Sequence, residues 1–182
     1  PQAELISRHM TQVQTIDPVT EPRWADRLQG TNINPVTLLA TDYLNHFNEV
    51  IMLVEMVADM PDMIEEVLAW EPKSYQQHFA ESGFRDKDLA IEAYEAAPGN
   101  IKAQFDALVA CLDSNIFKIQ KRLRDVDPAT TDDAFGEEIR VAVNRFHRLV
   151  EMISSVINGG TVKTAPEEAA APSAQDEIDA LF

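Results

Sequence analysis

The chain has 182 residues, which is enough for one domain with a substantial core and additional arms. It has 15 Lys and Arg residues against 31 Asp and Glu residues, and its formal net charge of -16 disfavours nucleic acid and anionic membranes as partners. No apolar run approaches the roughly 18 residues of a membrane span, and the N-terminus lacks the pattern of a secretory signal. We therefore expect a cytoplasmic protein without membrane insertion.

Residues 1–33 show no sustained periodicity, so we expect an N-terminal arm that Trp24 and Leu28 attach to the body. The first long helix is predicted to begin with Asn34 as N-cap and Pro35 at the first helical position. It is expected to continue to Asp59, and its excess of apolar surface would suit a homodimer interface. The apolar stripe of this helix consists of Val36, Ala40, Tyr43, Phe47, Val50, Val54 and Val57.

The rest of the body, up to residue 158, also has helical periodicity. Short helices are predicted over Asp62–Trp70 and within the segments KSYQQHFAES and DKDLAIEAYEAA, where Pro or Gly residues end them. Two long helices follow, the first capped by Asn100 and the second by Thr130 or Thr131. Their stripes are Ile101, Phe105, Leu108, Leu112, Ile116, Ile119 and Leu123, and then Ile139, Val143, Phe146, Val150, Ile153 and Ile157. The fold class is therefore all-α: a bundle of three long helices plus short helices over 34–158.

The C-terminal residues have a different composition from the bundle. Residues 159–172 are rich in Ala, Glu, Pro and Thr and are expected to form a flexible linker. In residues 173–182 a short helix would place Ile178, Leu181 and Phe182 on one face. The acidic residues Asp176, Glu177 and Asp179 would lie largely off that face. The segment is thus typical of a helical binding motif that orders on contact with a partner, although it could also fold back onto its own bundle.

The segment SAQDEIDALF resembles the segment that the flagellar motor switch protein FliM and the chemotaxis phosphatases of the CheZ type use to bind the response regulator CheY. Six consecutive residues match from Gln175 to Ala180, and Leu181 follows. The resemblance implies a chemotaxis or flagellar motility protein whose partner is a CheY-like response regulator. It implies that Ile178, Leu181 and Phe182 are the anchors, with the three acidic residues facing basic groups on the regulator.

Whether the body is catalytic remains open from the sequence. Phosphatases of the CheZ type use an Asp and a Gln one helical turn apart, and no Gln of this chain follows an Asp by four residues. Asp113, paired with Asn115 or Gln120, provides the nearest acid-plus-amide candidates. Dephosphorylation would use Mg2+ on the regulator and would need no cofactor on this chain. The alternative is a non-catalytic adaptor or phosphate sink for the regulator.

Two histidines suggest other chemistry. His46 and Glu49 lie three residues apart on one predicted helix, and His147 and Glu151 lie four apart on another, so facing helices could form a metal site. A helical metal-binding protein with a coincidental tail is therefore a further alternative. His147 is also a candidate for phosphotransfer, but the Lys-Gly that usually follows such a histidine is missing.

Overall fold

The computed structural model describes residues 21–127 and 132–160, and within these ranges the chain is mostly helical. The helices are α1 (Glu21–Arg27), α2 (Asn45–Val57), α3 (Ile64–Ala69), α4 (Tyr75–Glu81), α5 (Lys87–Ala96), α6 (Gly99–Leu123) and α7 (Asp133–Ile157), with 3-10 turns η1 (Thr41–Leu44) and η2 (Pro61–Met63). The only β pairing in the described ranges is an isolated bridge between Ile33 and Ala40. This confirms the all-α fold class. No helix in these ranges has both the length and the apolarity to cross a membrane.

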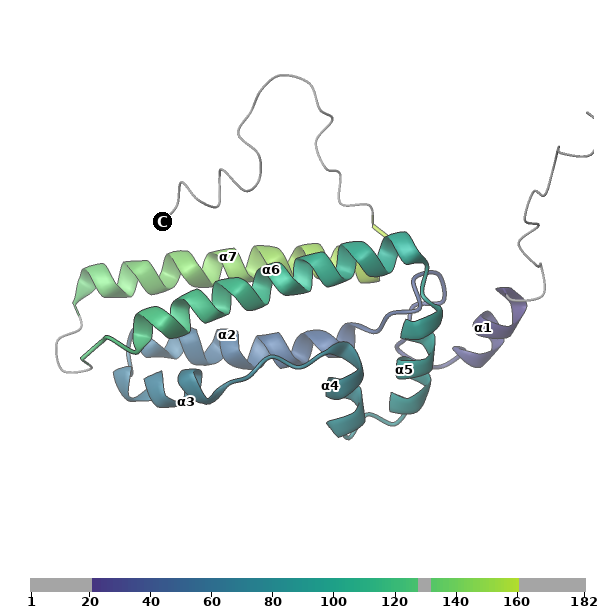
Figure 1. Ribbon diagram of the computed structural model, residues 1–182, viewed down its shortest axis with the longest axis horizontal. Coiled ribbons are helices and arrows are strands. Elements are labelled where there is room, and N and C mark those ends of the chain that lie inside the picture. The colour runs from purple at the N-terminus through teal and green to yellow at the C-terminus, as the bar shows by residue number, and fades with distance from the viewer. Residues whose placement is uncertain (1–20, 128–131, 161–182) are drawn as a thin grey trace, which may run out of the picture.

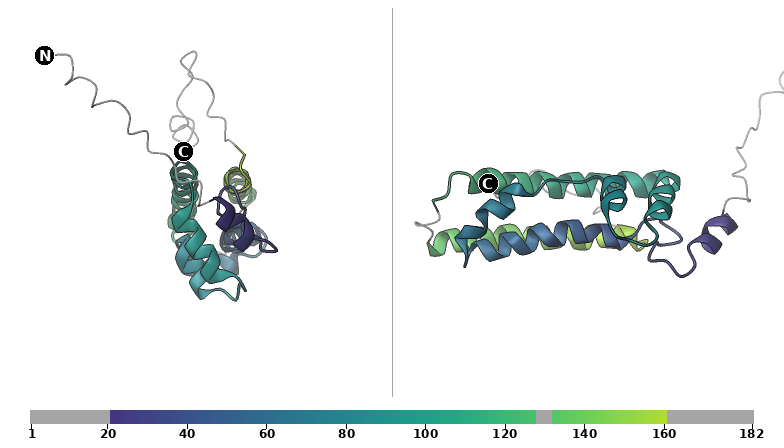
Figure 2. Two further views of the ribbon diagram at one scale, coloured as in Figure 1. Left: turned by 90° about the vertical axis from the view of Figure 1, so that its right-hand side faces the viewer. Right: turned by 90° about the horizontal axis from the view of Figure 1, so that it is seen from below.

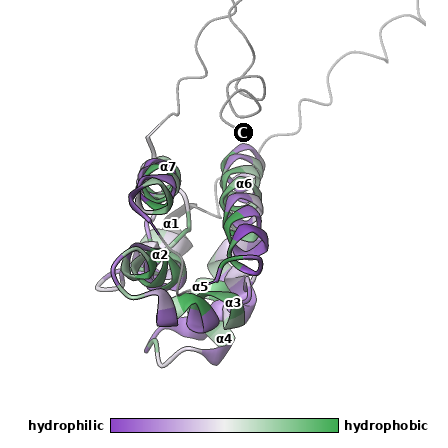
Figure 3. Ribbon diagram, turned by 90° about the vertical axis from the view of Figure 1, so that its left-hand side faces the viewer, coloured by the Kyte–Doolittle hydropathy of each residue, from purple (hydrophilic) through white to green (hydrophobic). Residues whose placement is uncertain are grey.

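The helices form an elongated bundle of two layers (Figures 1 and 2). One layer contains α2 and α7, and the other contains α6 with the shorter helices α3, α4 and α5. The long helices α6 and α7 lie side by side and antiparallel, and α7 also packs on α2. Viewed along the bundle, each of these helices has both apolar and polar residues, as expected for amphipathic helices around a shared core (Figure 3).

Most residues of the apolar stripes predicted for α6 and α7 are buried in the core. Leu112 and Ile116 of α6 and Ile153 of α7 are fully buried. Each of these two helices has 25 residues, whereas α2 has 13, so residues 21–127 and 132–160 contain two long helices where three were expected. At the start of α7 the Oδ1 atom of Asp132 accepts a hydrogen bond from the amide of Phe135 at 2.9 Å. The N-cap of α7 is therefore Asp132, and not Thr130 or Thr131 as predicted.

The helix predicted to begin at Asn34 does not form there, and this prediction was wrong. The Oδ1 atom of Asn34 does accept bonds from the amides of Val36, at 2.9 Å, and Thr37, at 3.1 Å. The bonds close a turn instead of opening a helix, because Leu38 then adopts a positive φ of 61°. Val36, expected in the apolar stripe, is 73% exposed. Regular α-helix begins only at Asn45.

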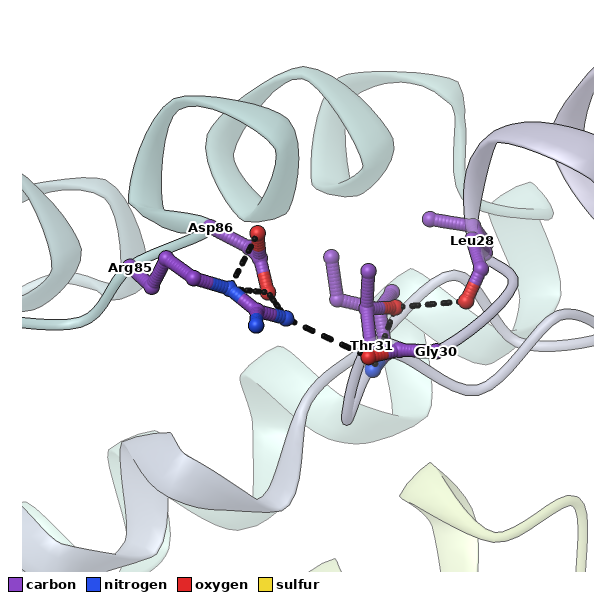
Figure 4. Close-up of polar contacts among 6 residues, drawn as sticks. Leu28, Gly30, Thr31, Arg85 and Asp86 are labelled. Atoms are coloured by element: carbon purple, nitrogen blue, oxygen red, sulfur yellow. Dashed lines mark hydrogen bonds and ion pairs between the residues drawn. The ribbon is translucent and has the colours of Figure 1, made fainter.

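Part of the predicted N-terminal arm belongs to the folded body. Leu28 is buried in the core, and Trp24 packs against it, as expected. Arg27 of α1 donates from Nη1 to Glu92 of α5 at 2.7 Å. Figure 4 shows a second link, in which Nη2 of Arg85 donates to the carbonyl of Gly30 at 3.2 Å while the guanidinium also pairs with Asp86. The core therefore extends N-terminally beyond the expected start at residue 34.

The edge of the bundle that contains α3 and α4 is interrupted by the non-helical residues 70–74 (Figure 1). Side chains of other elements bind the backbone of this connection. Tyr43 donates its hydroxyl to the carbonyl of Lys73 at 2.8 Å, and the amide of Lys73 donates to Nε2 of His46 at 3.0 Å. The indole of Trp70 in turn donates to the carbonyl of His46 at 3.3 Å. The interruption therefore retains partners for its buried polar groups.

Candidate functional site

A pocket of about 360 Å³ lies where the middle of α6 faces the 72–76 segment. We call it the tyrosine pocket, because all three tyrosines of the chain line it. The residues that line it are Tyr43, Pro72, Lys73, Ser74, Tyr75, Gln76, Tyr94, Phe105, Asp106, Val109, Ala110 and Asp113. Its size is within the range of sites for small ligands. The pocket combines an apolar wall with two carboxylates that come from one helix.

The three tyrosines have fixed positions through their hydroxyl groups. Tyr75 accepts a bond from the amide of Ala40 at 2.8 Å, and Tyr94 donates to Oδ1 of Asp106 at 2.7 Å. The rings of Tyr75 and Tyr94 stack with their centroids 4.7 Å apart. Burial raises the pKa of both hydroxyls well above the ordinary value, as it does for Tyr43. These hydroxyls therefore stay protonated at neutral pH. They act as fixed hydrogen-bonding groups and not as acids or bases.

Asp113 is the unusual group of the pocket. Its Oδ1 atom is buried and has no hydrogen-bond partner within the described part of the chain. Burial raises the pKa of the Asp113 carboxyl to about 6, because a low-dielectric environment disfavours its charged form. Most buried polar atoms in native proteins have a partner. Asp113 is consequently the residue of the body whose contacts most clearly call for an additional partner.

The two amides proposed to work with Asp113 have structural contacts of their own. Asn115 is buried, donates to the carbonyl of Cys111 at 2.8 Å, and receives a bond from Arg145 of α7 at 3.4 Å. Gln120 is also buried and donates to the carbonyls of Val67, at 2.9 Å, and Trp70, at 2.8 Å. The structure therefore does not bring either amide into the pocket of Asp113. Gln76, which the sequence did not single out, lines that pocket instead.

His46 is a buried structural residue in this fold. Its Nε2 atom accepts the amide hydrogen of Lys73, so the ring is neutral with its proton on Nδ1. The indole of Trp70 stacks on the ring, with a centroid distance of 4.8 Å. Burial, assisted by the neighbouring His78, lowers the pKa of His46 to about 4. A proton on Nε2 would break the bond to Lys73, so protonation would oppose the folded arrangement.

The two histidine pairs suggested as metal ligands lie apart. His147 of α7 contacts Glu55 of α2, with Nε2 and Oε1 2.9 Å apart, whereas His46 lies at the other end of α2. Glu49 shares a small pocket with His46 and His78, and Glu151 is exposed on α7. Within residues 21–127 and 132–160, no group of three or more His, Cys, Asp or Glu side chains is placed to hold a metal ion. The facing-helix site is not formed.

The residues expected to bind a partner through the tail, Asp176, Glu177, Ile178, Asp179, Leu181 and Phe182, lie outside the described residues, as does most of the linker. Comparisons with family models, curated proteins and solved structures found no match to this chain. The tyrosine pocket escaped the sequence analysis because its residues come from four separate segments. Of its residues, only Asp113 was identified from the sequence, as the acid of the acid-plus-amide candidates.

Proposed function

We propose that this protein acts in chemotaxis or flagellar motility by capturing a CheY-like response regulator with residues 173–182. The observation that supports this is the run from Gln175 to Leu181, which matches a known regulator-binding segment. The described helix α7 ends at Ile157, and Gly159 follows with a φ of 79°, which is typical of a helix C-terminus. The motif therefore follows the folded body at a distance of a dozen or so residues.

Attachment of the motif to the bundle would make the second contact of a captured regulator intramolecular. A linker over residues 161–172 would reach at most about 40 Å when fully extended. Flexible connections of this length give effective concentrations near the millimolar range. A weak contact between the regulator and the body would then be populated whenever the tail is bound, which is the advantage of joining the two parts.

Binding without catalysis is the form of this function that the contacts of the body favour. Asn115 donates to the carbonyl of Cys111 within α6 and accepts a bond from Arg145 of α7, and Gln120 donates to the carbonyls of Val67 and Trp70. Both amides are therefore engaged in structural contacts, which argues against a role in orienting a water molecule on a bound phosphoryl group. Asp113 faces a different side of α6 from Asn115, because residues two apart on a helix are separated by about 200°. We therefore propose an adaptor or phosphate-sink role ahead of a phosphatase role.

The test is titration of the full chain against CheY-like regulators, with and without a phosphoryl mimic. We expect micromolar binding that Leu181→Ala or Phe182→Ala abolishes, because these side chains are the proposed anchors. The matched control is Val162→Ala, which truncates an apolar side chain in the linker. It should leave the affinity unchanged. Equal binding by a chain that ends at Gly160 would contradict the proposal.

A phosphate-release assay on the same regulators separates the two forms of the function. An adaptor should leave the lifetime of the phosphorylated regulator unchanged when it binds. Acceleration by the full chain, lost in Asp113→Asn while binding persists, would instead assign catalysis to the body. The variant Asp125→Asn removes the same charge from an exposed position after α6 and serves as its control.

A further inference from the structure

We propose that residues 173–182, when no partner holds them, dock in a groove between α6 and α7 of the same chain, so that the bundle and the response regulator compete for one motif. The docking concerns this chain alone, whereas the competition rests on the proposed function. The body would then mask the segment that captures the partner.

The groove lies on the side of α6 and α7 that no other described helix covers (Figure 3). It has a volume of about 480 Å³, and most of the surface that it exposes is apolar. Its lining includes the buried residues Ile119, Ala142 and Phe146 and the exposed residues Ala134 and Val141. The side chain of Val141 is 47% exposed, so a ligand can contact it directly. A groove of this kind suits the apolar face of an amphipathic helix.

The helix segments beside the groove are basic in a chain that is otherwise strongly acidic. Residues 115–124 and 139–150 contain seven Lys and Arg residues and no Asp or Glu, while the whole chain has a net charge of -16. Arg145 lines the groove. Lys118 and Arg148 each lie three residues after a lining position, which places them on the same faces of their helices. The groove therefore attracts acidic side chains to its edges.

Two glutamates also line the groove, but each of them has a basic partner. Glu137 accepts a bond from Arg140, three residues later in α7, and Glu138 accepts a bond from Arg122 of α6 at 3.0 Å. These contacts largely offset the two negative charges within the body. A segment that combines apolar and acidic side chains thus complements this surface.

Residues 173–182 have that combination, with three apolar residues on one face of the expected helix and three acidic residues largely off it. Val141 lies 16 positions before the end of α7, or about 24 Å along the helix. The linker over 161–172 spans up to about 40 Å, so the motif can reach the groove of its own chain. A second copy of the chain is a poorer occupant, because a two-fold contact would place the same basic face against itself.

The docking is tested with a fluorescent peptide of residues 173–182 and a full chain whose own motif is inactivated by Leu181→Ala and Phe182→Ala. We expect this chain to bind the peptide with a Kd on the order of 100 μM. The unsubstituted chain should bind it about 10-fold more weakly, because its own motif occupies the groove at an effective concentration near 1 mM. Adding Val141→Glu to the inactivated chain should weaken peptide binding at least 10-fold. Val36→Glu, at a valine that is 73% exposed elsewhere, is the matched control and should have no effect.

The charged part of the contact has its own test. Arg148→Glu should weaken peptide binding, and added salt should do the same, because the acidic residues of the motif lose part of their attraction to the groove. Urea unfolding of each variant separates loss of the groove from loss of the fold. Peptide binding that none of these changes affects would overturn the proposal. So would a dimer that Val141→Glu dissociates, since it would assign the groove to a second copy.

Regulator binding separates this proposal from the proposed function. With competition, a CheY-like regulator should bind the Val141→Glu chain about 10-fold more tightly than the unsubstituted chain, and the Val36→Glu chain as the unsubstituted one. A peptide that binds the groove but no regulator would refute the proposed function and leave the docking intact. Regulator binding that is equal in all three chains, with no peptide bound by the groove, would refute the docking alone.

Discussion

The hydrogen bonds of Gln120 lead to a strong prediction about stability. The side chain is 2% exposed, and its Nε2 atom donates to two carbonyls at the C-terminal end of α3, those of Val67 and Trp70. Gln120→Met keeps nearly the same shape and removes both donors. The two carbonyls would then lose their side-chain donor in a buried environment, where water cannot replace it.

The expected cost follows from those two bonds. A buried hydrogen bond contributes about 1 kcal/mol net, and a polar group left without a partner costs about 1–3 kcal/mol. The carbonyl of Val67 retains the amide of Trp70 at 3.3 Å, so its loss is partial. We therefore expect Gln120→Met to lower the free energy of unfolding by about 2–4 kcal/mol. For a chain of this size that corresponds to a decrease in Tm of roughly 5–15 °C.

Urea unfolding, followed by circular dichroism, measures this effect through the transition midpoint at constant slope. Gln104→Met, an exposed position on the same helix, is the control and should change the stability by less than about 0.5 kcal/mol. If Gln120→Met were as stable as this control, the assignment of Gln120 as the cap of α3 would be refuted.

Three further predictions concern stability. The raised pKa of Asp113 means that its native carboxyl binds a proton more tightly than the unfolded one does, so its contribution to stability falls as pH rises from about 4 to about 6. Asp113→Asn should remove this dependence, about 1 kcal/mol after allowance for solvent screening, in unfolding measured across that range. The lowered pKa of His46 has the opposite consequence, a loss of about 1–2 kcal/mol as pH falls from about 6.5 to about 4. His46→Gln should flatten that decline, and an unchanged pH profile would contradict the role of the ring as acceptor. Thr37 is fully buried and donates to the carbonyl of Ile157 at 2.5 Å. Thr37→Val should therefore lower the free energy of unfolding in urea by about 1–2 kcal/mol. An unchanged free energy would show that this bond does not contribute to stability.

The long helices could be predicted from sequence because their signals extend over many residues. In α6 and α7, each of 25 residues, a periodic apolar stripe continues over several helical turns, and Gly159 marks the end of the second helix. The predicted start of the first helix was wrong because Asn34 gives the same local signal at a helix N-cap and in an isolated turn. Its side chain accepts amide bonds from the next residues both at a helix N-cap and in an isolated turn. The positive φ of Leu38 selects the turn, and nothing in its side chain indicates that.

The candidate site was less accessible to sequence reasoning than the fold. Asp113 could be identified as the acid of a candidate acid-plus-amide pair, but its environment depends on Tyr43, Ser74 and Tyr94, which lie on other elements. Gln120 was a candidate for a reactive amide because its position next to the stripe residue Ile119 did not show where its side chain points. Its partners are 53 and 50 positions away in sequence. Contacts at such separations follow from the packing of the helices, and no local pattern determines them.

The interrupted edge between α3 and α4 also bears on how the molecule folds. The pairing of α6 with α7 closes only a short loop, whereas residues 70–74 are bound by side chains from α6, η1 and the start of α2. Because local contacts are less costly to close, the helical hairpin is expected to form first and the edge to dock late. Substitutions at Gln120 should then mainly accelerate unfolding, while substitutions of Leu112 or Ile153 should slow folding. In the native protein the same edge is where transient opening should begin, with early hydrogen exchange at the amide of Lys73.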